Sequence, residues 1–130
     1  MDDLILKELA SYMEFREHLN QQFDRMNSVY QTLKLHNNLN DVPLLHLDLA
    51  EIYSLRTGSK VYYSCFIDLH HYEFSSFFSF FDILYLEFKE VLESQSNDFI
   101  ELDSEFENVK EQFKIIDQML KDKIDSMKAI

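Results

Sequence analysis

Apolar residues recur along the C-terminal half of the chain at alternating steps of three and four. The series runs from Phe78 to Met127, and only Gln95 and Lys123 interrupt it with polar side chains. This alternation is a repeat of about 3.5 residues, which is typical of the seam of a left-handed coiled coil. Many of the positions between the apolar residues are acidic, as on a solvated helix face. The pattern predicts one long helix over residues 75–128.

The N-terminal third carries a shorter version of the same spacing, clearest from Leu19 to Leu33. It predicts a helix over residues 3–38, because an asparagine-rich cluster suits a helix end and Pro43 opposes continuation. We expect the two helices to pair antiparallel. The predicted seam consists of Leu19, Phe23, Met26, Tyr30, Leu33, Phe81, Tyr85, Phe88, Leu92, Phe99, Leu102 and Phe106.

The segment between the two helices has a different rhythm. Leu45, Leu47 and Leu49 alternate with polar residues, and a period of two is typical of a half-buried strand. Residues 60–69 are rich in aromatic and β-branched side chains, and Gly58, the single glycine, indicates a turn before them. The sequence therefore predicts a β segment over 44–74. The expected fold class is α+β, mainly α: an antiparallel helix pair joined by a small β-hairpin segment, in one domain over 1–130.

So few strands bury little surface and leave free edges, and free edges pair with strands of other subunits. We therefore expect a subunit interface at the β segment and the start of the second helix. Its predicted residues are Leu45, Leu47, Leu49, Val61, Tyr63, Phe66, Phe77 and Phe80.

Antiparallel pairing would place residue 2 opposite about residue 113, so the second helix would extend beyond the first by roughly 15 residues. Apolar residues on this overhang would lack a partner within the chain. They predict a tip for clients or effectors, and a frayed helix end is the alternative. The predicted tip residues are Ile116, Met119, Leu120 and Ile124.

Three stretches resemble prefoldin subunits of the α class, most closely the UXT-type branch. They are Val29–Leu33, Leu47–Ala50 and the run from Val61 to Phe74 into the long heptad helix. The resemblance implies a helical arm on a β platform shared with α-class and β-class subunits, which holds non-native proteins without hydrolysing ATP. Where the family usually has glycines at its second hairpin turn, this chain has His70 to Phe74.

The charge of the chain narrows the choice of partners. Its formal net charge is −12, which disfavours nucleic acids and anionic membranes as ligands. The most apolar stretch is too short and too polar to span a bilayer. Cys65 is the single cysteine, so no internal disulfide is possible, and we expect a cytoplasmic protein, with the nucleus left open.

We found no pattern for catalysis. The chain has no phosphate-binding glycine loop, no pair of cysteines and no repeated histidine spacing, so we expect no catalytic residue, no cofactor and no metal. The favoured function is a non-enzymatic subunit of a prefoldin-like chaperone complex. The alternatives are a prefoldin subunit of the type that serves cytoskeletal proteins, and a coiled-coil adaptor of another assembly. Strands at 44–69 would favour prefoldin, whereas a helical or disordered connector there would favour the adaptor.

Overall fold

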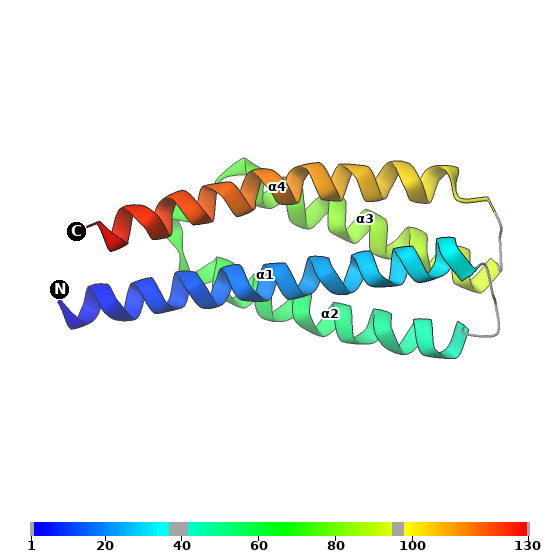
Figure 1. Cartoon of the computed structure of the whole chain (residues 1–130), viewed down its shortest axis with the longest axis horizontal. Coiled ribbons are helices and arrows are strands. Elements are labelled where there is room, and N and C mark those ends of the chain that lie inside the picture. The colour runs from blue at the N-terminus through cyan, green and yellow to red at the C-terminus, as the bar shows by residue number, and fades with distance from the viewer. Residues whose placement is uncertain (1, 37–41, 95–97, 130) are drawn as a thin grey trace.

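Helices account for almost all of the chain that the computed structural model describes, which is residues 2–36, 42–94 and 98–129. The elements are α1 (Asp3–His36), α2 (Val42–Cys65), the short 3-10 helix η2 (Ile67–Leu69), α3 (Tyr72–Ser94) and α4 (Ile100–Lys128). Figure 1 shows the four long helices side by side, each antiparallel to the one before it, with both termini at the same end. The predicted α+β class is wrong: the chain is mainly helical, as expected, but its described helices form an up-and-down bundle.

The predicted β segment is wrong, because none of the described residues forms a strand and residues 42–65 form α2. Leu45, Leu49 and Ile52 are buried at spacings of four and three, whereas Leu47 is exposed. The apparent period of two therefore arose because Leu45 and Leu49 belong to the buried side of a helix, while Leu47 between them lies on its exposed side. Pro43 lies in the first turn of α2, where its missing N–H leaves no helical bond unmade.

Gly58 lies inside α2 and not in a turn. A Cβ atom built there would be 3.3 Å from Nδ1 of His18 on α1. The residue thus lacks a side chain where two helices approach closely, which explains a glycine at a position that otherwise disfavours it by about 1 kcal/mol.

The predicted long second helix is two helices, α3 and α4, which pack antiparallel against each other. Ser94 ends α3, and the Asp98 carboxylate accepts a hydrogen bond from the Ile100 N–H at the start of α4 (3.2 Å). The polar run between the two helices is a turn signal that the heptad spacing concealed. The seam break at Gln95 lies outside the described residues.

Helix α1 confirms the first predicted helix, and it packs against α4 as well as α2. The rings of Phe23 and Phe113 stack with centroids 4.4 Å apart, and those of Tyr30 and Phe106 at 4.0 Å. Stacked aromatic pairs add to the stabilisation from burial alone. The predicted register of the antiparallel pair, with residue 2 opposite about residue 113, is wrong, because Phe113 stacks on Phe23. Helix α1 pairs instead with the C-terminal heptads of α4, as one interface of the bundle.

Candidate partner-binding surface

The outward faces of the four helices differ in chemistry. Helices α1 and α4 expose mostly charged and amide side chains, whereas the outward stripes of α2 and α3 carry no charge from Leu47 to Val61 and from Tyr72 to Leu86. We call these two stripes together the uncharged face. It consists of Leu47, Ala50, Ser54, Thr57 and Val61 on α2, and Tyr72, Ser75, Ser79, Ile83 and Leu86 on α3, all of them exposed.

A hollow of about 270 Å³ lies between α2 and α3, beside the uncharged face. Tyr53, Tyr85 and Leu86 form its apolar lining. The Arg56 guanidinium donates from Nη2 to Oδ2 of Asp82 (2.7 Å), so the two charges in the hollow neutralise each other. Direct contact between α2 and α3 is sparse compared with that of the α1–α2 and α3–α4 pairs. The hollow is therefore a mainly apolar gap in the bundle surface.

Carboxylates gather at the C-terminal end of α3, on the flank next to α4, in a groove that we call the acidic groove. Glu87, Glu90 and Glu101 line it, together with Ile100, and its volume is about 340 Å³. Partial burial and repulsion from Glu90, Glu101 and Glu105 raise the pKa of Glu87. Among the described residues, no lysine or arginine forms an ion pair with any of these glutamates.

The carboxylates between α1 and α4 are by contrast well bonded. Arg16 pairs with Asp117 (2.8 Å), and Asp103 accepts bonds from Lys34 Nζ (2.8 Å) and the Tyr30 hydroxyl (2.5 Å). Burial acts to raise the pKa of Asp103, but the bonds from Lys34 and Tyr30 outweigh it and lower the pKa. These charges connect the helices and leave little for a ligand.

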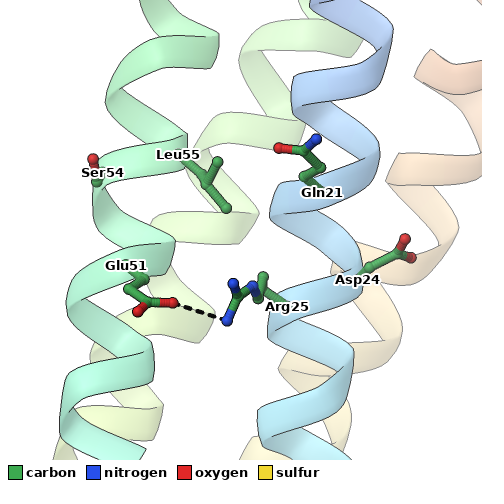
Figure 2. A pocket seen from close by; sticks show the side chains of 6 residues that line it. All are labelled: Gln21, Asp24, Arg25, Glu51, Ser54 and Leu55. Carbon is green, nitrogen blue, oxygen red and sulfur yellow. Dashed lines mark ion pairs between the residues drawn. The ribbon is translucent and has the colours of Figure 1, made fainter.

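A hollow of about 600 Å³ lies between α1 and α2, and Figure 2 shows the side chains that line it. Arg25 and Glu51 reach toward each other across it and form an ion pair of 2.8 Å between Nη1 and Oε2, while Asp24 points away. Gln21, Ser54 and Leu55 complete the lining. Both charged partners are about half exposed, so the pair contributes little stability and presents no unpaired group.

A third polar cluster joins α1, η2 and α4 near the termini. The Tyr12 hydroxyl lies 2.7 Å from each carboxylate oxygen of Asp68, and Lys123 Nζ lies 3.0 Å from Oδ2. Burial and the bond to Asp68 raise the pKa of Tyr12. Burial acts to raise the pKa of Asp68, but Tyr12 and Lys123 outweigh it and lower the pKa. The cluster is therefore a structural cross-link; Cys65 lies exposed beside it.

Two kinds of site are absent from the described ranges, residues 2–36, 42–94 and 98–129. No group of three or more histidine, cysteine, aspartate or glutamate side chains there could hold a metal ion. No helix in the same ranges combines the length and the apolar character needed to cross a membrane.

The predicted interface residues divide between the surface and the core. Leu47 and Val61 are 58% and 61% exposed and belong to the uncharged face. Leu45, Leu49 and Phe77 are buried, and the half-buried remainder consists of Tyr63, Phe66 and Phe80. Tyr53, Ile83 and Leu86 were not predicted as interface residues. Their signal was the presence of apolar residues outside the heptad positions of an otherwise amphipathic helix.

The predicted seam residues lie in or against the shared core of four helices. Those buried are Leu19, Met26, Leu33, Phe81, Phe88, Leu92, Leu102 and Phe106. Those half-buried are Phe23, Tyr30, Tyr85 and Phe99. Heptad spacing thus identified inward-facing residues, although their partners come from a bundle.

The overhang that motivated the predicted tip is not present in the described part of α4. Ile116, Leu120 and Ile124 are buried and Met119 is half-buried, while Lys123 reaches Asp68 and lies over the ring of Tyr12 on α1. The reason is the reversal between α3 and α4, which lets α4 lie along α1. A client-binding role for these residues would require the bundle to open.

Comparison with known proteins gave no further guide: no protein-family model, no curated protein and no solved structure matches the chain.

Proposed function

We propose that the chain is a non-enzymatic adaptor, which joins a protein assembly by binding a partner through the uncharged face. The observation that carries the proposal is the exposure of this face. Ile83 and Leu86 are 48% and 62% exposed on a helix that also buries a full apolar stripe. A helix that is apolar on both sides is normally covered on both sides, and contiguous apolar patches mark interaction sites.

The helical middle segment also favours the adaptor among the functions that the sequence left open. A prefoldin-type platform needs strands between the two arms, and residues 42–65 form α2 instead. The prefoldin-like chaperone role stays a prediction without strands to support it. The adaptor needs only a stable helical body with one face left for a partner.

The test is recovery of bound proteins from the source cell with the tagged chain. We expect the double variant Ile83→Gln with Leu86→Gln to lose its main partner, because it removes exposed apolar surface without changing charge or the core. Ile115→Gln is the matched control, since Ile115 is 43% exposed on the charged face of α4. Equal partner recovery by all three proteins would contradict the proposal.

A further inference from the structure

We propose that the partner element is a basic amphipathic helix that lies along α3, with its apolar side on the uncharged face and its basic side over the acidic groove. This inference rests on the proposed adaptor function and adds the chemistry of the partner. It requires that α3 present apolar groups on its outward stripe and unpaired acids on the neighbouring flank.

The first requirement is met along the middle of α3. Ile83 and Leu86 point outward, and the hollow beside them is lined by Tyr53 and Tyr85, whose ring centroids are 5.6 Å apart. An amphipathic helix docks by placing residues at i, i+3, i+4 and i+7 into such a groove. The gap left by the sparse α2–α3 contact is therefore suited to one or two apolar side chains of a partner.

The size of the apolar surface also fits a single helix. The apolar side chains there expose about half of their area or more, so they offer on the order of 600 Å² together, against roughly 800 Å² per partner in a standard interface. The apolar side chains counted are Leu47, Tyr53, Val61, Tyr72, Ile83 and Leu86.

The second requirement is met on the α4 side of α3. Glu87 and Glu90 continue the helix past Leu86, and Glu101 faces them from α4 across the groove. Partial burial, and then repulsion from the neighbouring glutamates, raises the pKa of Glu87, and no described lysine or arginine relieves the repulsion by an ion pair. A partner carrying lysine or arginine would relieve this repulsion while its apolar residues dock, which is electrostatic complementarity.

The same charges disfavour a second copy as the occupant. Each chain has a formal net charge of −12, so two copies repel before they meet. A copy packed on α3 would also have to place its own glutamates near Glu87 and Glu90, or leave the acidic groove empty. A basic helix removes both difficulties.

The experiment measures fluorescence anisotropy of a labelled synthetic helix of about 18 residues, built from leucine on one face and lysine on the other. Two peptides serve as probe controls. One has glutamate in place of lysine, and the other has the same leucines and lysines in scrambled order. We expect the ordered leucine–lysine peptide to bind at least tenfold more tightly than either control, a difference of about 1.4 kcal/mol or more.

Two double variants, each with two substitutions to glutamine, test the apolar and the acidic part of the surface separately. Ile83→Gln with Leu86→Gln, and Glu87→Gln with Glu90→Gln, should each weaken binding of the ordered peptide about tenfold. The matched control is Glu17→Gln with Glu107→Gln, which makes the same change in net charge at exposed positions of α1 and α4. We expect it to change the affinity by less than about twofold, since exposed charges at a distance are screened.

Three results would overturn the inference. The scrambled peptide could bind as well as the ordered one, the two surface variants could match the control variant, or sedimentation could show a dimer that Ile83→Gln with Leu86→Gln dissolves. The first two outcomes mean non-specific charge attraction, and the third makes a second copy the occupant. If partner recovery in cells still depends on Ile83 and Leu86, the adaptor function stands although the basic helix is wrong. If recovery does not depend on them, the proposed function itself fails.

Discussion

The α1–α4 pair and the α2–α3 pair are joined by different means. Between α1 and α4, two aromatic pairs stack, and the Asp117 and Asp103 carboxylates form ion pairs with Arg16 and Lys34. Between α2 and α3, the helix backbones make sparse contact. The described side chains that bridge them include the ion pair of Arg56 with Asp82 and the ring contacts of Tyr53 with Tyr85 and of Tyr63 with Phe74 and Phe78. Outside, α1 and α4 expose mostly charged and amide side chains, whereas α2 and α3 carry the uncharged face.

This difference separates stability from binding within one small bundle. On the α1–α4 side, the Asp117 and Asp103 carboxylates are bonded within the bundle, to Arg16 and to Lys34 and Tyr30. The α2–α3 side leaves apolar area and a gap that only another molecule can cover. We therefore expect substitutions on the two sides to affect different measurements.

The largest effect is expected for Phe106→Asp. Phe106 is buried on α4 and stacks on Tyr30, so the substitution places an unpaired charge in the core and should cost about 4 kcal/mol or more. Ile83→Asp, on the uncharged face, should cost less than about 0.5 kcal/mol in the isolated chain. Urea unfolding of both variants measures these costs. Similar losses of unfolding free energy would contradict the proposal that the two sides serve stability and binding separately.

A smaller effect, of opposite sign, is expected for Gln22→Leu. Gln22 is fully buried on α1, and neither amide atom has a hydrogen-bond partner among the described residues. Removing the unpaired amide should therefore stabilise the bundle by about 1–2 kcal/mol. The neighbouring Gln21→Leu, on the exposed side, should change stability by less than about 0.5 kcal/mol. A destabilised Gln22→Leu protein would mean that the amide has a bonded role.

The smallest effect is expected for Glu87→Gln, and it depends on pH. Because the folded state raises the pKa of Glu87, through burial and then repulsion, ionisation of this group costs stability above its folded-state pKa. The cost vanishes below the ordinary glutamate pKa of about 4.3, where the group is protonated in both states. Glu87→Gln should therefore gain less than about 1 kcal/mol at pH 7 and nothing near pH 4. Urea titrations at both pH values measure the difference, and a gain independent of pH would exclude this mechanism.

The sequence was a better guide to burial than to topology. The heptad spacing identified Leu19, Met26, Phe88 and Leu102 as inward-facing, and all four are buried. It could not distinguish one long helix from two that fold back, because the spacing continues across the polar run after Ser94. The polar residues there were the only sign of the reversal.

The middle segment was predicted wrongly because its alternating leucines, Leu45 to Leu49, fit both the period of two of a strand and the spacing of four of a helix. Leu45 and Leu49 are four apart, as a helix requires, and leucine has a high helix propensity. The exposed residues of the candidate site were harder still to predict. Which apolar residues of α3 face outward depends on where α2 and α4 lie, and spacing within one helix does not contain that information.

Both termini lie at one end of the bundle, and the acidic groove lies toward the other, where α3 passes into α4. A tether attached at either terminus would therefore hold the bundle by one end and leave the acidic groove at the free end. If the protein is attached to a biosensor chip or bead by its N-terminus or its C-terminus, every molecule would take the same orientation, with the glutamates of the acidic groove toward the bulk solution. Attachment at random surface lysines would instead scatter the orientations, so the two loadings should differ in the amount of cationic peptide retained.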